Sequence, residues 1–254
     1  MNLSELEIAA RDAWPALEEQ EQPFGVLRYS NGVNRRSNSL NVYADVDYQL
    51  GKLVDITEQF FRQRRQPAIV RILCPDHAVQ NKFHHLDNYL SACGYAIEAL
   101  TQVMSLDLWQ SEFTVPTGGN VGIVCDRCTW LQARQGLIGF NDEQRNIHQK
   151  ILGKIACPSR CLVIEDATGF PVSCGMAVLS GAALGIYGLA TKEHHRGRGY
   201  ASALVQSLLQ WGISQGARYA YLQVESSNTV AWRLYNDLGF SDRYSYWYRV
   251  KQLH

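Results

Sequence analysis

The second half of the chain alternates between short apolar runs and longer segments whose apolar residues recur every three or four positions. Runs of the first kind are typical of buried strands, and the second spacing is typical of helices with one buried face. The runs predict strands at 121–127, 161–165, 172–180, 183–191, 218–225 and 244–251. The longer segments predict helices at 130–138, 142–155, 201–214 and 229–238, with Asn141 as the N-cap of the second. This order predicts a mixed α/β (α+β) domain.

A glycine-rich turn joins the strand at 183–191 to the helix at 201–214. Gly197 and Gly199 allow the backbone to turn with no Cβ in the way, so that successive N–H groups can point into one concavity. The first turn of the following helix adds unpaired N–H groups and the positive end of the dipole, and such a structure binds phosphate. The dinucleotide motif G-x-G-x-x-G would need a glycine at Ser202, and the nucleoside triphosphate loop needs a lysine that is missing here. Taken alone, the turn is equally compatible with a plain glycine-rich loop.

A second motif, V-E-S-S-N-T-V-A-W-R-L-Y-N-D-L-G-F, covers residues 224–240. Within this motif the helical spacing i, i+3, i+4 and i+7 is met by Ala231, Leu234, Tyr235 and Leu238. This spacing places Tyr235 on the inward face of its helix, where the hydroxyl can reach a site between strands. Gly239 is suited to end the helix in the left-handed conformation. On its own, Tyr235 is also compatible with a core tyrosine whose hydroxyl is satisfied locally.

Together the two motifs resemble those of the GCN5-related N-acetyltransferase (GNAT) superfamily. Arg196, Gly199 and Ala201 match the R-x-x-G-x-A form of its pyrophosphate-binding signature, and the second motif matches the other half. The resemblance implies a mixed, mostly antiparallel sheet flanked by helices, with acetyl-CoA as acyl donor and no metal. It implies direct attack on the thioester by the amine of a small molecule or peptide. A catalytically idle acyl-CoA-binding regulatory module is the alternative function.

The resemblance also assigns roles to individual residues. The main chain of the strand before the turn would pair with the pantetheine arm, the turn would hold the pyrophosphate, and Tyr235 would protonate the departing thiolate. The implied cofactor-binding residues are Leu189, Ala190, Thr191, Arg196, Gly197, Arg198, Gly199, Tyr200, Ala201, Ser202 and Asn228. In several family members a carboxylate on the strand corresponding to 183–189 acts as the general base. This strand has no carboxylate here. Glu225 is therefore the candidate catalytic base, with Glu165 or a water chain as alternatives, whereas His194 and His195 are expected at the surface or near phosphate.

The first half carries a faint echo of the second motif at residues 80–109. Aligning its Gly94 with Gly239 places helix on helix and strand on strand, and a helix at 46–61 and a strand at 68–73 precede it. Leu90 then stands at the position of Tyr235, and Phe83 at that of Asn228. We therefore expect a degenerate GNAT-like domain at 1–110, a linker at 111–120 and a catalytic GNAT domain at 121–254. An unrelated small α/β domain is the alternative for the first half.

A polar segment at residues 28–39, R-Y-S-N-G-V-N-R-R-S-N-S, resembles one found in tandem members of the superfamily. Its asparagines and serines could brace the contact with the catalytic half or line the acceptor site. Charge runs of this kind are usually solvated surfaces. A basic patch around Arg35 and Arg36 would also suit an enzyme that acts on charged tRNA.

Overall composition bounds the remaining function classes. Lys plus Arg and Asp plus Glu number 24 each, which argues against nucleic acid or an anionic membrane as partner. No apolar run approaches the roughly 20 residues of a membrane span. The N-terminal M-N-L-S-E-L-E-I-A-A-R-D predicts an amphipathic helix rather than a signal peptide, which favours the cytoplasm. The seven cysteines, including C-x-x-C at 125–128 and C-x-x-x-C at 157–161, are predicted to be reduced core thiols rather than zinc ligands. A homodimer is compatible with all of this.

Overall fold

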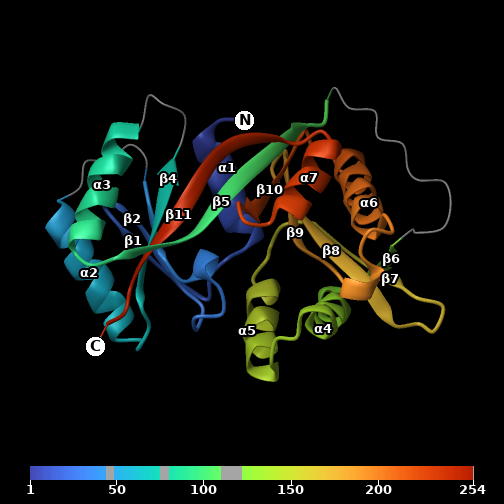
Figure 1. Cartoon of the computed structure of the whole chain (residues 1–254), viewed down its shortest axis with the longest axis horizontal. Coiled ribbons are helices and arrows are strands. Elements are labelled where there is room, and N and C mark those ends of the chain that lie inside the picture. The colour runs from blue at the N-terminus through green and yellow to red at the C-terminus, as the bar shows by residue number, and fades with distance from the viewer. Residues whose placement is uncertain (44–48, 75–79, 110–121, 254) are drawn as a thin grey trace. The chain divides into compact units, whose positions relative to one another are not determined.

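The computed structural model describes residues 1–43, 49–74, 80–109 and 122–253, so the predicted linker at 111–120 lies outside the described residues (Figure 1). The chain forms two compact units, and each unit combines segments from both halves of the sequence. The first unit comprises Met1–Pro15, Ser105–Leu222 and Leu234–Ser241. The second comprises Ala16–Met104, Gln223–Arg233 and Asp242–His254.

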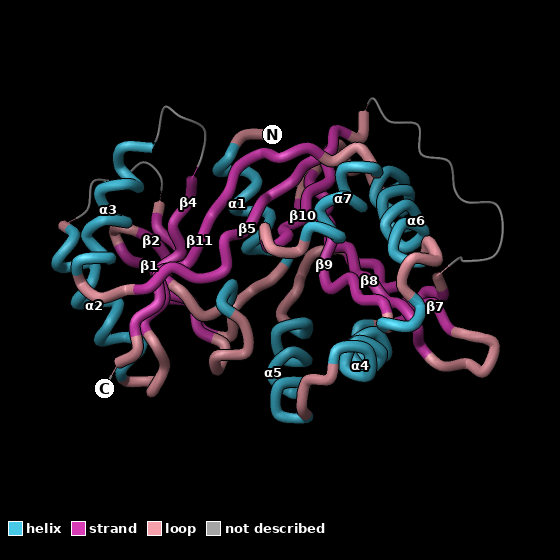
Figure 2. The backbone as a smooth tube through the Cα atoms, in the orientation of Figure 1, coloured by secondary structure: helices cyan, strands magenta, loops and turns pink. Residues whose placement is uncertain are grey.

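The first unit is built on neighbouring strands (magenta in Figure 2), which form an antiparallel series with one parallel addition. In order across the sheet, the strands are β6 (Ile123–Cys125), β7 (Ser159–Glu165), β8 (Pro171–Ser180), β9 (Ala183–Thr191) and β10 (Tyr219–Glu225), whose last residues belong to the second unit. The helices are α1 (Leu3–Ala13), α4 (Arg127–Ile138), α5 (Asp142–Gly153) and α6 (Tyr200–Ser214), and the end of α7 (Thr229–Asp237) joins them. Helices α1, α4 and α6 each pack against β8 and β9.

The elements predicted for the second half are confirmed to within a few residues at each end. Strand β9 has the predicted bounds, and Asn141 caps α5 by accepting a hydrogen bond from the Gln144 N–H at 2.8 Å. The reason is local, because each helix of this half has an apolar stripe and each strand an apolar run. The structure therefore confirms the mixed, mostly antiparallel fold class.

The second unit contains the first-half strands and the last strand of the chain. Its strands are β1 (Glu18–Gln22), β2 (Gly25–Tyr29), β3 (Leu40–Val42), β4 (Ala68–Cys74), most of β5 (Ala96–Asp107) and β11 (Ser241–Lys251). Helices α2 (Leu50–Arg62) and α3 (Gln80–Ala92) pack against β4. Strand β11 runs antiparallel to β4, from Ser245 opposite Cys74 to Lys251 opposite Ala68.

This organisation differs from a division of the chain in sequence order. The predicted boundaries at 1–110 and 121–254 would assign α1 to the first domain and β11 to the second. In the structure α1 belongs to the first unit together with residues 105–222, and β11 belongs to the second unit together with β1–β4. The hairpin β1–β2 and the short strand β3 have no counterpart among the predicted elements.

The predicted repeat has a matching local geometry in each unit. Helix α3 ends where the Gly94 N–H bonds to the Ser91 carbonyl, and the next N–H bonds back to the Leu90 carbonyl at 3.0 Å. After α7, the Phe240 N–H makes the same bond to the Tyr235 carbonyl at 3.0 Å. Gly94 and Gly239 have φ values of 85° and 90°. Both helices therefore end in the same left-handed turn, with Leu90 at the position that Tyr235 occupies in the other.

The cysteines are all free thiols. Cys161 and Cys174 are buried, as predicted for core thiols, and burial raises the pKa of each thiol to about 12. The prediction was wrong for Cys128, which is exposed on α4. Within the described residues, no His, Cys, Asp and Glu side chains group as a metal site would require, and no helix is long and apolar enough to cross a bilayer.

Candidate acyl-transfer site

A β-bulge interrupts β9 shortly before the glycine-rich turn. Cys174 of β8 lies opposite Ala190, but Met176 lies opposite Tyr187, so two residues of β9 face one residue of β8. The first of the two, Gly188, has φ 57°. A Cβ at this position would lie 2.4 Å from the Trp130 ring, so only glycine fits both the backbone and the packing. Bulges of this kind change the direction of the strand and are common next to active sites.

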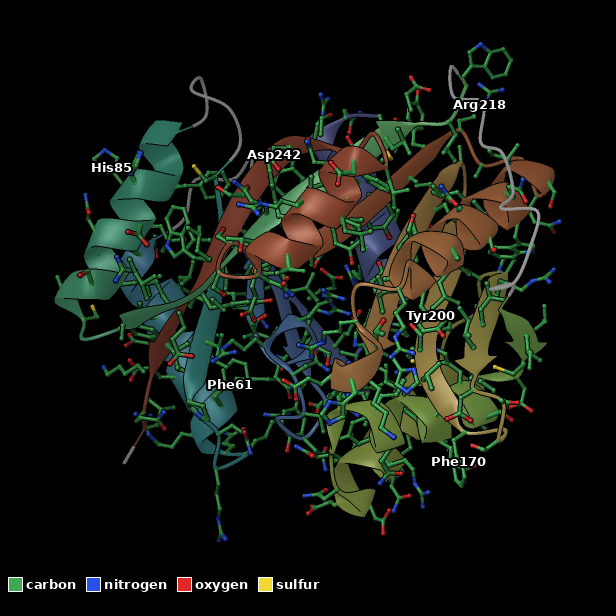
Figure 3. The ribbon with its side chains drawn as sticks, turned by 45° about the vertical axis from the view of Figure 1, so that its right-hand side comes forward. Phe61, His85, Phe170, Tyr200, Arg218 and Asp242 are labelled. Atoms are coloured by element: carbon green, nitrogen blue, oxygen red, sulfur yellow. The ribbon has the colours of Figure 1, made fainter. Side chains whose placement is uncertain are left out.

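The glycine-rich turn has the geometry that an anion requires. Gly197 and Gly199 have φ values of 74° and 79°, and nothing lies within 4 Å of the position where either would carry a Cβ. Gly199 is the N-cap of α6, and no side chain caps the helix. Its first turn holds no acidic residue, and Tyr200 lies at its start (Figure 3). The N–H groups of this turn therefore face an exposed surface with no side-chain acceptor among the described residues.

The other turn residues lie in or beside this exposed segment. Arg196 and Arg198 are exposed, whereas Tyr200, Ala201 and Ser202 are half-buried at the start of α6. The Arg196 Nε donates to the Thr191 carbonyl at 3.4 Å, which connects the turn to the end of β9. Ser173 of β8 donates to the Ala190 carbonyl at 2.9 Å and also bonds to the Thr191 hydroxyl at 2.8 Å. The half-buried residues Leu189, Ala190 and Thr191 thus lie on a fixed strand that leads directly into the turn.

Tyr235 is buried in the first unit, with 8% of its surface exposed. Its ring packs edge-on against Phe240 at 6.1 Å between centroids. Within the described residues, its hydroxyl makes no hydrogen bond. Burial raises the pKa of Tyr235 to about 12, so the hydroxyl keeps its proton at neutral pH. The structure therefore confirms the inward orientation that the helical spacing predicts.

Asn228 and Glu225 belong to the second unit, and both side chains are exposed there. The Asn228 Oδ1 accepts a hydrogen bond from the Ala231 N–H at 3.1 Å, which caps the first turn of α7. Glu225 ends β10, and its carbonyl accepts from the Asn228 N–H at 2.8 Å. Both side chains lie outside the unit that contains the glycine-rich turn, so their contact with a cofactor or substrate stays a prediction.

An aromatic cluster next to the bulge was not predicted from the sequence. Trp14 stacks on Tyr187 at 5.8 Å between ring centroids, and the buried imidazole of His148 meets Trp14 at 6.2 Å and Phe140 at 5.3 Å. The Tyr187 hydroxyl bonds to that of Tyr221 at 2.8 Å. The available signal was the position of His148 on the apolar stripe of α5, which the alternation of apolar residues alone does not distinguish from a core position.

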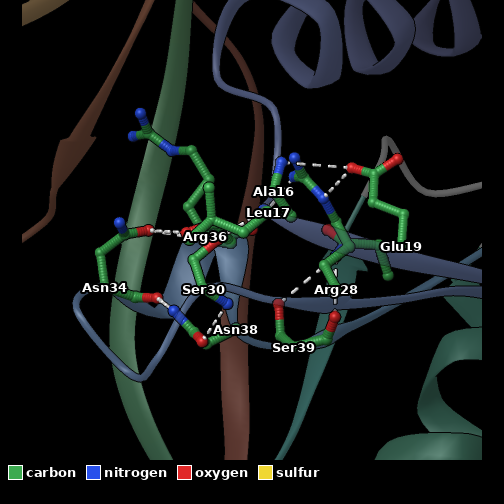
Figure 4. Close-up of polar contacts among 11 residues, drawn as sticks. Ala16, Leu17, Glu19, Arg28, Ser30, Asn34, Arg36, Asn38 and Ser39 are labelled. Atoms are coloured by element: carbon green, nitrogen blue, oxygen red, sulfur yellow. Dashed lines mark hydrogen bonds and ion pairs between the residues drawn. The ribbon is translucent and has the colours of Figure 1, made fainter. Parts of the chain in front are cut away.

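The polar segment at residues 28–39 is held together by hydrogen bonds between its own residues (Figure 4). Asn38 is 3% exposed, and its Oδ1 accepts hydrogen bonds from the N–H groups of Ser30 and Gly32 at 2.7 and 2.8 Å. Its Nδ2 donates to the Asn34 carbonyl at 2.7 Å. Arg28, also buried, pairs with Glu19 at 2.9 Å. These side chains hold a turn within the second unit, and Arg35 of the suggested basic patch pairs with Glu98.

We expect Asn38→Ala to lower the free energy of unfolding by about 2–4 kcal/mol, because it removes the partner of the buried Ser30 N–H, of the Gly32 N–H and of the Asn34 carbonyl. Urea denaturation followed by circular dichroism measures this. Asn88→Ala, at an exposed position of α3, is the control and should change stability by less than about 0.5 kcal/mol. An Asn38→Ala protein as stable as this control would contradict the bracing role.

Comparison with known proteins identifies the family. Residues 126–240 match the model of the acetyltransferase (GNAT) family. Residues 126–240 are a GNAT domain. The matched region begins at the N-cap of α4 and ends at the turn after α7, so it includes the bulge, the glycine-rich turn and Tyr235.

Relatives extend the similarity to the whole chain. It is 24% identical over 260 residues to YobR of Bacillus subtilis (strain 168), described as an uncharacterized N-acetyltransferase, with 99% of each chain covered. Among solved structures, a GCN5-related N-acetyltransferase from Kribbella flavida matches with a TM-score of 0.68 at 12% identity, covering 99% of this chain and 94% of the other. A tandem GNAT protein from the clavulanic acid biosynthesis pathway matches with a TM-score of 0.64 at 13% identity, covering 83% and 73%. The tandem GNAT fold is thereby confirmed, and the family indicates an acetyltransferase.

Proposed function

We propose that the protein transfers an acetyl group from acetyl-CoA to a primary amine by direct attack. The observation that carries this is the uncapped N-terminus of α6, which follows two left-handed glycines at the end of β9. A pyrophosphate fits there because it needs several N–H donors, favours the positive end of a helix dipole and is repelled by acids, of which the first turn has none. A glycine-rich loop without a ligand would have no reason to leave the N–H donors of this helix N-terminus without a capping side chain.

Residues of the first unit along and next to β9 would then bind successive parts of acetyl-CoA and protonate its sulfur. Residues 197–202 bind the pyrophosphate, and the main chain from Thr191 back to Leu189 holds the pantetheine arm. Four strand residues span about 10 Å, so an arm laid along them brings the thioester close to the bulge at Gly188. Tyr235 donates its proton to the sulfur as the carbon–sulfur bond breaks. Glu225 is the base that the sequence suggests.

Isothermal titration calorimetry with acetyl-CoA tests the donor site. We expect micromolar binding to the wild-type protein and at least about tenfold weaker binding to Gly199→Glu, because the new carboxylate places a negative charge among the phosphate donors. The loss of affinity should appear equally with CoA, since the pyrophosphate is common to both.

Gly169→Glu is a closely matched control. Gly169 lies in the β7–β8 turn with φ 79°, the same value as Gly199, and also has no atom within 4 Å of a Cβ. The backbone strain of the two substitutions is therefore alike, and only their location differs. Equal affinity of the two variants, or no binding to the wild-type protein, would rule out the proposed donor site.

A further inference from the structure

His148 is a buried histidine that the proposed roles do not use. It lies on α5 with 8% of its surface exposed, in contact with the rings of Trp14 and Phe140. Its Nδ1 lies 2.8 Å from the Gln144 carbonyl oxygen one turn earlier. A carbonyl can only accept, so Nδ1 carries the proton and Nε2 has the free lone pair.

The free nitrogen is open to a partner. Within the described part of the chain, Nε2 has no hydrogen bond, and it is not among the fully buried polar atoms that lack one. The small exposed surface of His148 therefore includes Nε2. A histidine that only filled the core would have no need of an accessible lone pair.

The surroundings also keep the imidazole neutral. Burial lowers the pKa of His148, and the positive charge of Arg134 on α4 lowers it further, against the hydrogen bond to Gln144. Trp14 contacts both His148 and Tyr187 of β9. The Tyr187 hydroxyl is bonded to that of Tyr221. No carboxylate among the described residues contributes to the shift. The lone pair is consequently available at neutral pH.

Two series of side-chain contacts connect His148 to the bulge of β9 through intervening residues. Along the first, His148 meets Trp14, and Trp14 stacks on Tyr187, the residue directly before Gly188. Along the second, the ring of Phe140 lies 5.3 Å from His148 and 5.7 Å from the Arg134 guanidinium. The Arg134 Nε lies 3.1 Å from the Cβ position of Gly188.

We propose that His148 is the general base that takes the proton from the acceptor amine, and this rests on the proposed function. In this step an N–H bond of the ammonium breaks, its proton moves to Nε2 and its electron pair remains on nitrogen. That pair forms the bond to the thioester carbon, the carbon–sulfur bond breaks, and the sulfur receives the Tyr235 proton. The nitrogen then loses its second proton to the Tyr235 phenolate, which leaves the neutral amide and restores the phenol, and His148 returns its proton to solvent. An accessible neutral base inside the first unit replaces the exposed Glu225 of the second unit in this role.

Thiol release from acetyl-CoA with methylamine as acceptor probe tests the proposal, because so small an amine enters any acceptor site. We expect His148→Gln to lower kcat/KM by about 10²-fold or more and to remove the loss of activity at acid pH that protonation of the base causes in the wild-type protein. Acetyl-CoA affinity by calorimetry should be unchanged. His85→Gln, at an exposed position of α3, is the control and should behave as wild type.

A second measurement needs no acceptor. Diethyl pyrocarbonate acylates neutral accessible imidazoles, and peptide mass mapping should show modification of His148 that acetyl-CoA slows while His85 reacts unchanged. A His148→Gln protein that keeps both rate and acid limb, no acceleration by a wild-type protein that binds acetyl-CoA, or no protection of His148 would each overturn the proposal. Failure of acetyl-CoA to bind would instead overturn the proposed function.

Discussion

Tyr235→Phe is expected to lower turnover by about 10²- to 10⁴-fold and to leave acetyl-CoA affinity within about twofold of the wild type. The phenyl ring keeps the edge contact with Phe240, so the variant removes only the hydroxyl. That hydroxyl is neutral because burial raises its pKa to about 12, and a neutral phenol can protonate a thiolate. Thiol release with methylamine gives kcat, and calorimetry gives the affinity.

Tyr89→Phe on α3 is the matched control for loss of a tyrosine hydroxyl. Tyr89 is exposed and lies one position before Leu90, the residue that corresponds to Tyr235 in the other half. We expect this variant to be fully active. If Tyr235→Phe also kept full turnover, the hydroxyl would have no part in protonating the thiolate. If the wild-type protein bound acetyl-CoA without turnover, the alternative of an idle acyl-CoA-binding module would be favoured.

The sequence predicted best where local pattern decides the structure. The glycine-rich turn, the cap at Asn141 and the inward orientation of Tyr235 each depend on residues within a few positions of one another. The similar turns after α3 and α7 were also predictable, because a glycine with positive φ ends both helices.

Long-range relations were not predictable in the same way. An apolar run such as that of β11 shows that a strand exists but not which strand it pairs with, and β11 pairs with β4, more than 150 positions away. The same holds for Trp14, whose stacking on Tyr187 brings the N-terminal segment into the first unit. The bulge at Gly188 depends on the register with β8, and the role proposed for His148 depends on the orientation of one ring, neither of which the spacing of apolar residues specifies.

Asp87→Ala is expected to destabilise the second unit by about 3–5 kcal/mol, since it leaves a buried guanidinium without its partner. Asp87 of α3 accepts hydrogen bonds from the Arg249 Nε at 2.7 Å and a second Arg249 nitrogen at 2.6 Å, and from the Trp247 indole at 2.7 Å. Arg249 also donates to the Tyr95 carbonyl at 3.1 Å. These bonds fasten the last strand of the chain to α3, and urea denaturation measures their loss.

The pH dependence of stability follows from the same pair. Burial alone would raise the pKa of Asp87, but the hydrogen bonds from Arg249 and Trp247 and the charge of Arg249 lower it overall. A carboxyl with a lowered folded-state pKa stabilises the fold above its unfolded value of about 3.9, and the contribution is lost as the pH falls through the folded value. The wild-type protein should therefore lose stability below about pH 4 more steeply than Asp87→Ala.

Two further variants separate the pair from the general effect of removing a charge. Glu98→Ala breaks the exposed pair with Arg35 and should cost less than about 1 kcal/mol, because solvent screens that interaction. The double variant Asp87→Leu/Arg249→Met removes both buried charges and should recover much of the stability lost in Asp87→Ala, since no ion is then left unpaired in the interior. A double variant no more stable than Asp87→Ala would mean that the packing of α3, rather than the ion pair, holds β11. Recovery would show that one buried charge pair holds β11 against α3 in the second unit.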